Sequence, residues 1–255
     1  MDFGGVVAQL GERRVRNAKV EGSIPFHSTN PLSVSAVKDF VVSLMGTNPY
    51  DGFDTAGRQL DITGWQFRHP WFEAIITQLK PRSILEVGTW KGASAILMAQ
   101  LARRFNPQAE VLCVDTWLGS HRVLWSNPEY RRQLDLKNGY PQQYYQFLAN
   151  VVLSNMRDVI FPMPMTSYAA TDILLASTLR FELIYIDAHH DEDEVYGDVK
   201  RCWKLLRPGG TMFGDDYLVT EPGVVKAVNR FAAEGGHYLH TQAEKWAIQK
   251  SPGTP

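Results

Sequence analysis

The sequence is short of cysteine, of net charge and of long apolar runs. Its only two cysteines among 255 residues, Cys113 and Cys202, stand in apolar stretches without metal-site spacing, which indicates buried thiols in a reducing compartment. We therefore expect a cytoplasmic protein. No apolar run reaches the roughly 18 residues of a membrane span, and the N-terminus lacks the apolar segment of a secretory signal. The formal net charge of −1 gives no reason to expect nucleic acid or a membrane as a partner.

The N-terminal segment lacks a sustained apolar period. Residues 7–30 resemble the peptide obtained when a transfer-RNA gene is translated conceptually, which suggests a mis-called start, with Met45 as one candidate for the true beginning. The competing interpretation is a genuine basic arm. In either case we expect little order before Pro31 and weak packing up to about Tyr50. The predicted division is therefore a poorly ordered segment 1–49, one domain at 50–250 and a frayed tail at 251–255.

Residues 82–94 organise the rest of the chain. Residues 83–87 are predicted to be a short buried strand, Gly88 and Gly92 bracket a turn, and a helix begins near residue 93. Such a unit points backbone N–H groups and a helix N-terminus at the carboxyl end of a sheet, where an anionic or nucleoside ligand fits. Glu86 lies at the end of the strand and can accept hydrogen bonds from hydroxyl or ammonium groups. The alternative is an ordinary turn whose glycines allow close packing.

Apolar strands and helical periods alternate along the remainder of the chain, which has no internal repeat. Helices are predicted at 71–79, 93–105, 142–155, 168–177, 191–206 and 222–233, and strands at 83–87, 110–114, 158–161, 181–186 and 211–213, followed by a closing hairpin of 237–240 and 245–249. Residues 120–141 form a long aromatic segment, typical of a flap over a site. The pattern predicts one doubly wound, Rossmann-like α/β domain whose mostly parallel sheet ends in an antiparallel hairpin.

Polar side chains follow the predicted strands at their carboxyl ends, where ligands bind in open α/β sheets. They are Glu86, Asp115, Ser167, Asp187, and Asp215 with Asp216. An acidic residue at the position of Asp115, in the unit after a glycine turn, is suited to hydrogen-bond a ribose diol.

Five segments together resemble class I S-adenosylmethionine-dependent methyltransferases. They are LEVGTWKGAS, VDTW, MTS, YIDAHH and LRPGG followed by TMFGDDY, and the match covers about residues 71–249. The branch that they resemble comprises divalent-metal O-methyltransferases of the catechol and caffeoyl-CoA type, with relatives in antibiotic and sugar modification. The resemblance implies the same doubly wound fold.

The resemblance also implies a role for each matched cofactor residue. Glu86 and Gly88 would line the methionine side of S-adenosylmethionine, and Ser94 would hold its amino-acid carboxylate. Asp115 would bind the ribose hydroxyls, with Thr116 and Trp117 beside the adenosine. Thr166 and Ser167 stand where the family contacts adenine, and Asp187 also borders the cofactor.

A metal site and a base are implied in the same way. Asp187, Asp215 and Asp216 match the family's metal ligands, and three carboxylates suit Mg²⁺ or Mn²⁺. Asp215 and Asp216 could equally be turn residues after a strand. His190 stands where catechol-type enzymes place a lysine base, as in the antibiotic-modifying relatives, which argues against a catechol or caffeoyl-CoA substrate. His190 and Asp187 are thus the predicted catalytic residues, and His189 is expected to cap the following helix.

The predicted reaction is metal-assisted O-methylation of a small hydroxylated molecule such as a sugar, a polyketide or a phenol. One alternative is an NAD(P)-dependent oxidoreductase on a similar sheet, although the turn reads G-T-W-K-G and lacks G-x-G-x-x-G. A second is a binding module that holds S-adenosylmethionine without turnover, and a third is a methyltransferase that uses His190 without a metal. The sequence leaves the acceptor and any homo-oligomeric state open.

Overall fold

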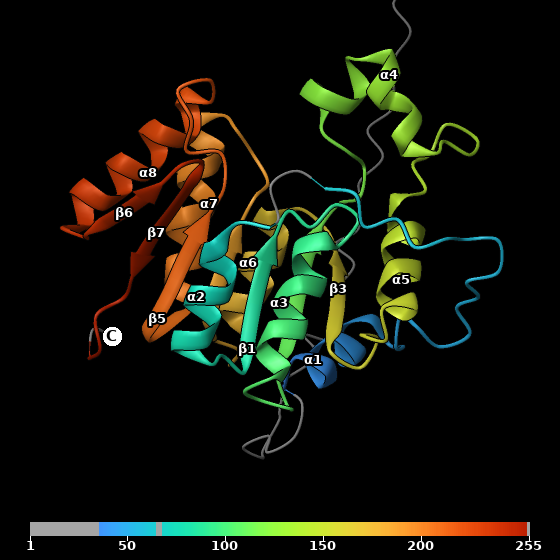
Figure 1. Ribbon diagram of the computed structural model, residues 1–255, viewed down its shortest axis with the longest axis horizontal. Coiled ribbons are helices and arrows are strands. Elements are labelled where there is room, and N and C mark those ends of the chain that lie inside the picture. Colours follow the sequence, from blue (N-terminus) through green and yellow to red (C-terminus); the bar gives the residue numbers. More distant parts are fainter. Residues whose placement is uncertain (1–35, 65–67, 254–255) are drawn as a thin grey trace, which may run out of the picture. The chain divides into compact units, whose positions relative to one another are not determined.

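Seven strands form one sheet in the order β3-β2-β1-β4-β5-β7-β6 in the computed structural model, which describes residues 36–64 and 68–253 (Figure 1). The parallel strands are β1 (Ser83–Val87), β2 (Glu110–Asp115), β3 (Ile160–Pro164), β4 (Phe181–Ile186) and β5 (Leu206–Gly214). β7 (Lys245–Gln249) runs antiparallel to β5 and pairs with β6 (Leu239–Gln242) in a hairpin. The predicted doubly wound sheet with a closing antiparallel hairpin is therefore confirmed.

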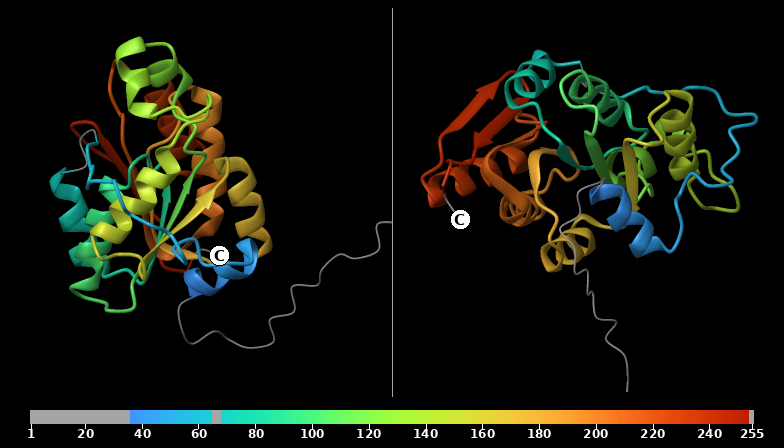
Figure 2. Two further views of the ribbon diagram at one scale, coloured as in Figure 1. Left: turned by 90° about the vertical axis from the view of Figure 1, so that its right-hand side faces the viewer. Right: turned by 90° about the horizontal axis from the view of Figure 1, so that it is seen from below.

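Helices cover both faces of this sheet (Figure 2). α2 (Pro70–Leu79) and α3 (Ala93–Arg103) pack together on one face, while α6 (Ser167–Ala176), α7 (Glu192–Leu205) and α8 (Pro222–Gly235) lie on the other. Burial on both faces explains why the strands are apolar almost throughout. α5 (Gln143–Leu153) packs against the turn after β1, where Phe147 touches Gly92. Within residues 36–64 and 68–253, no helix has the length and apolarity needed to cross a membrane.

β3 and β5 differ from the predicted strands. β5 begins at Leu206 and includes Pro208-Gly209-Gly210, whereas the predicted strand began at residue 211. Its register with β4 shifts between Phe181 and Leu183. Gly209 adopts a φ of +80°, and the chain bulges near this point within β5. β3 contains two prolines, and it tolerates them because it is the edge strand and pairs on one side only.

The flap predicted at 120–141 is folded into short helical turns. A π-helical turn, η1 (His121–Trp125), is followed by α4 (Pro128–Arg131) and the 3₁₀ turn η2 (Arg132–Leu134), which Figure 1 places beyond the strand ends. Leu124 and Leu134 are buried against Gly119, where a Cβ atom would lie 2.5 Å from Leu134. The flap thus has a small apolar core of its own.

α1 (Ala36–Met45) differs from the weak packing expected up to Tyr50. Val37 and Val41, one helical turn apart, are buried, and the helix packs on β2 and β3. The Val37 N–H donates to the Glu110 carboxylate at 2.9 Å, and the Tyr50 hydroxyl donates to the Ile160 carbonyl at 2.7 Å. A start at Met45 would remove all of α1 except its last residue. The segment 7–30, on which the mis-called start rests, lies outside the described residues, as do residues 254–255 of the tail.

Replacing a buried side chain of α1 tests whether this helix is part of the stable fold. We expect Val41→Ala to lower the free energy of unfolding by about 1–3 kcal/mol, because the deleted methyl groups leave a cavity against the sheet. Ser43→Ala, at an exposed position of the same helix, should change it by less than about 0.5 kcal/mol. Urea unfolding followed by circular dichroism measures both, and equal stabilities of the two variants would contradict the packing of α1.

Candidate active site

Backbone hydrogen bonds hold the carboxyl ends of the central strands together. The Gly88 N–H donates to the Val114 carbonyl at 2.9 Å, the Asp187 N–H to Val87 at 2.8 Å, and the Asp215 N–H to Ile186 at 3.1 Å. These bonds join the ends of β1, β2, β4 and β5. The residues predicted at these ends therefore form two groups, one around the glycine turn and one around the acidic residues after β4 and β5.

Gly88 permits the close approach of β1 and β4. Its φ is +81°, and a Cβ atom at this position would lie 1.9 Å from the carbonyl oxygen of Asp187. Any side chain would therefore separate the two strand ends on either side of the predicted cofactor position. This is the tightest requirement for glycine at the site.

Glu86 is completely buried at the end of β1. Its carboxylate accepts hydrogen bonds from the hydroxyl groups of Thr89 and Ser94, and the Cys113 thiol lies 3.5 Å away. Burial raises the pKa of Glu86 to about 7, because the three hydrogen bonds only partly offset the loss of water and the negative charge of Asp115 adds to the shift. Ser94, predicted to hold the cofactor carboxylate, thus hydrogen-bonds Glu86 in this structure.

Asp115 organises the glycine turn from the end of β2. One carboxylate oxygen accepts the backbone N–H groups of Thr89 and Trp90, both at 2.9 Å, and the other accepts the N–H of Trp117 at 2.7 Å. A carboxylate offers about four lone-pair positions, so Asp115 retains capacity for a further donor such as a ribose hydroxyl.

The predicted adenosine contacts lie in three different settings. The Trp117 ring is buried against Tyr144 and Phe147, with ring centres 5.0 and 4.9 Å away, whereas Thr116 is partly exposed beside it. Thr166, rather than Ser167, is the N-cap of α6, and its hydroxyl accepts the Ala169 N–H at 3.2 Å. Ser167 opposes the rise that burial causes in the pKa of the buried Asp198 of α7.

The acidic group after β4 and β5 is built around a buried tyrosine and a buried lysine. The Tyr185 hydroxyl lies 3.3 Å from a carboxylate oxygen of Asp187 and 3.3 Å from one of Asp215. Lys245 of β7 donates to Asp215 and, at 3.2 Å, to Tyr185. Burial raises the pKa of Asp187 well above its ordinary value, and the charges of Asp215 and Asp216 raise it further. Burial also raises the pKa of Asp215, against the opposing effect of Lys245.

These residues do not fit the predicted metal site. Asp215 uses one oxygen for Lys245 and the other for the Asp216 N–H at 2.8 Å, while the Asp216 carboxylate faces His190 at 2.9 Å. In the part of the chain that the structure describes, no three His, Cys, Asp or Glu side chains converge as metal ligands. Asp215 and Asp216 instead pair with Lys245 and His190, and one oxygen of Asp187 lies 3.3 Å from the Tyr185 hydroxyl.

His190 lies between two carboxylates. Its Nε2 atom is 2.9 Å from Asp216 and its Nδ1 atom is 3.2 Å from Glu221. The hydrogen bond with Asp216 raises the pKa of His190 above its usual value, and the charges of Asp216 and Glu221 act in the same direction against burial. His189 is exposed and pairs with Glu194 of α7 at 3.1 Å, so the structure separates the roles of the two histidines.

The flap reaches this histidine through Arg122. The guanidinium of Arg122 lies 3.9 Å from Asp191 and 3.9 Å from Glu221, the carboxylate that also contacts His190. Sequence reasoning identified the flap and His190 but missed this connection, because Arg122 and Glu221 are far apart in the chain.

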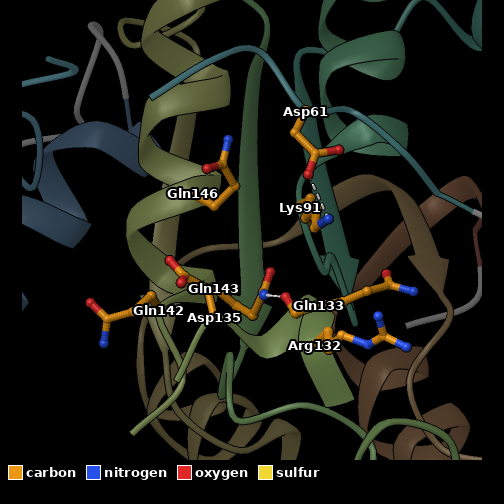
Figure 3. Close-up of a pocket in the computed structure, with 8 residues that line it drawn as sticks. All are labelled: Asp61, Lys91, Arg132, Gln133, Asp135, Gln142, Gln143 and Gln146. Carbon is orange, nitrogen blue, oxygen red and sulfur yellow. Dashed lines mark hydrogen bonds and ion pairs between the residues drawn. The ribbon is translucent and has the colours of Figure 1, made fainter. Parts of the chain in front are cut away.

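A polar cavity of about 410 Å³ lies beside the glycine turn (Figure 3). Lys91 of the turn forms an ion pair with Asp61 at 2.6 Å inside it, and neither residue was singled out from the sequence. The cavity is bounded by Asp61, which precedes α2, by the glycine turn, by the flap and by α5. Its lining is Asp61, Lys91, Arg132, Gln133, Asp135, Gln142, Gln143 and Gln146. The predicted cofactor and catalytic residues lie outside this lining.

Comparison with solved structures relates the fold to methyltransferases. An O-methyltransferase from Bacillus cereus in complex with SAH is 15% identical, with a TM-score of 0.52 over 83% of this chain and 91% of that chain. A calicheamicin methyltransferase is 14% identical, with a TM-score of 0.51 over 70% of this chain and 77% of that chain. At these identities the similarity establishes the fold. No curated protein matches the chain.

Comparison with protein families is more direct. Residues 85–217 match the family described as Methyltransferase domain, and this range covers more than half of the 255-residue chain. It begins in β1, includes the glycine turn and the flap, and ends just after Asp215 and Asp216. The chain therefore belongs to the Methyltransferase domain family, as the resemblance of its motifs to class I methyltransferases predicted.

Proposed function

We propose that this protein transfers the methyl group of S-adenosylmethionine to a hydroxyl oxygen of a small molecule. The observation that carries the proposal is the meeting of Glu86, the glycine turn and Asp115 at the carboxyl edge of a sheet whose family is that of methyltransferases. The solved structure of the O-methyltransferase from Bacillus cereus, which shares the fold, contains SAH. Sugars, polyketides and phenols remain the proposed acceptors.

The residues around the glycine turn fit the cofactor. The remaining lone pair of Asp115 is suited to a ribose hydroxyl, and Glu86 with Gly88 and Ser94 would line the methionine part. The adenosine would be bordered by Thr116, Trp117, Thr166 and Ser167. Among these residues, Trp117 is buried. When bound, the cofactor supplies a sulfonium methyl group.

The chemical step needs an acceptor oxygen in line with the methyl group and a destination for the hydroxyl proton. The carbon–sulfur bond breaks as the carbon–oxygen bond forms, which yields a methyl ether and S-adenosylhomocysteine. His190, partly exposed after β4, is the proposed proton acceptor; to accept the proton its ring must be neutral and one of its contacts with Asp216 and Glu221 must open to the acceptor. Asp187, whose backbone carbonyl adjoins Gly88 and whose carboxylate lies 3.3 Å from the Tyr185 hydroxyl, is proposed to help position the acceptor.

The metal-assisted form of the reaction would require Asp215 to release Lys245 and Asp216 to release His190. We therefore assign no step to Mg²⁺ or Mn²⁺. The step described above depends only on groups of the chain, the cofactor and the acceptor.

Calorimetry with S-adenosylhomocysteine tests cofactor binding. We expect the native protein to bind S-adenosylhomocysteine and Asp115→Asn to bind it with at least ~10-fold lower affinity, or ~1.4 kcal/mol. The reason is that an amide cannot accept all the backbone hydrogen bonds that the Asp115 carboxylate accepts. Asp158→Asn, at an exposed position, is the matched control and should bind normally. Binding of NADH without binding of S-adenosylhomocysteine would favour the oxidoreductase instead.

Replacement of the two histidines tests the proposed base. His190→Gln should lower kcat by ~10²–10⁴-fold toward an acceptor found in a panel of hydroxylated compounds, with cofactor affinity unchanged. His189→Gln should retain activity, since His189 is exposed and faces Glu194. Radiolabelled methyl transfer measures both. Full activity of His190→Gln would refute the role of this residue, and cofactor binding without any product across the panel would favour a non-catalytic binding module.

The pKa of Glu86 predicts a pH-dependent stability. Between pH 4.5 and about 7 the folded protein keeps a proton on Glu86 that the unfolded chain releases, so stability should fall as pH rises through this range. The shift corresponds to ~3 kcal/mol at full effect. Relative to the native protein, Glu86→Gln should therefore gain stability as the pH rises from 4.5 to 7. Urea unfolding at several pH values measures this difference; Glu129→Gln, an exposed control, should follow the native protein, and parallel curves for Glu86→Gln would contradict the prediction.

A further inference from the structure

A lysine is completely buried beneath the acidic residues at the end of β5. Lys245, the first residue of β7, has no exposed surface, and its ammonium group donates to the Asp215 carboxylate and to the Tyr185 hydroxyl. The rings of Phe72 and Tyr185 lie 5.6 and 5.5 Å from its Nζ atom. A buried ammonium is costly unless it is paired, so this arrangement requires the carboxylate.

Lys245 supplies positive charge where three carboxylates gather. Asp187 and Asp215 both contact the Tyr185 hydroxyl at 3.3 Å, and Lys245 contacts the same hydroxyl at 3.2 Å. The lysine is thus bonded directly to Asp215 and is joined to Asp187 through Tyr185. Its charge opposes the rise in the pKa of Asp187.

The same contacts occupy the oxygens that a metal ion would need. Asp215 directs one oxygen at Lys245 and the other at the Asp216 N–H, and the Asp216 carboxylate faces His190. A divalent ion at this position would place its charge close to the buried ammonium, and the like charges would repel strongly where water is excluded. Binding of the ion would therefore require Lys245 to leave a site in which it has no exposed surface.

We propose that the ammonium group of Lys245 replaces the divalent metal ion at this site, so that methyl transfer by this chain proceeds without a metal. Lys245 is a positioning residue, since it is buried and reaches the acceptor only through Asp215, Tyr185 and Asp187. The inference that transfer is metal-independent rests on the proposed function, whereas the exclusion of the metal ion does not.

Titration with Mn²⁺, followed by electron paramagnetic resonance, tests the exclusion directly. We expect Lys245→Met to bind Mn²⁺ at least ~10-fold more tightly than the native protein, because removal of the ammonium frees the carboxylates. The double variant Lys245→Met/Asp215→Asn should lose this gain. The matched control is Lys250→Met: Lys250 is also buried, but it donates to the backbone carbonyls of Trp203 and Leu206 at 3.2 and 3.0 Å, so its removal should not create a Mn²⁺ site.

The native protein alone provides a second measurement, which decides the question if Lys245→Met does not fold. Tight Mn²⁺ binding by the native protein that Asp215→Asn abolishes would overturn the proposal, and so would a folded Lys245→Met variant with no gain in affinity for Mn²⁺.

Methyl transfer by the native protein should be unchanged after dialysis against EDTA. Loss of methyl transfer after dialysis, with recovery on added Mg²⁺, would also overturn the proposal. Failure of the proposed function is distinguishable, because it would abolish product formation with and without EDTA and leave the Mn²⁺ titration unaffected.

Discussion

Compensation of buried negative charge at one edge of a parallel sheet is the constraint on which this site depends. Four strands end in carboxylates at this edge, and the glycine turn brings the ends of β1 and β4 into backbone contact at Gly88. Carboxylates that lie so close together and are partly removed from water must be protonated, hydrogen-bonded or paired with a positive charge. The structure uses a different solution for each. Glu86 accepts hydroxyl groups, Asp115 accepts backbone N–H groups, Asp215 pairs with Lys245, and Asp216 pairs with His190.

These solutions divide the site into two functional halves. In the half around Glu86 and Asp115, the carboxylates are hydrogen-bonded to residues of the glycine turn. The half around His190 connects to the flap, since Glu221 contacts both His190 and Arg122. A change in flap position would therefore reach the environment of the proposed base through Arg122 and Glu221.

Most of the fold could be predicted because its signals are local. The apolar runs of the strands and the helical periodicity between them each depend on residues that are close in the sequence, and so does the pattern of the final hairpin. These patterns predicted the sheet and its hairpin. The predicted and observed elements differ where contacts between distant parts of the chain decide the local structure. β5 begins at Leu206 rather than at residue 211 because the chain bulges near Gly209, and α1 packs against the domain because β2 and β3 receive Val37 and Val41.

The sequence by itself determined the family, the order of the elements and the set of acidic residues at the strand ends, because motifs and periods are written in consecutive residues. Only the tertiary structure decided what each acidic residue is bonded to. Lys245 follows Asp215 by thirty positions and sits on an antiparallel strand added at the end of the chain, so nothing near either residue predicts the pair. Once β7 pairs with β5, however, the ammonium has no route to solvent, and the nearest carboxylate must neutralise it.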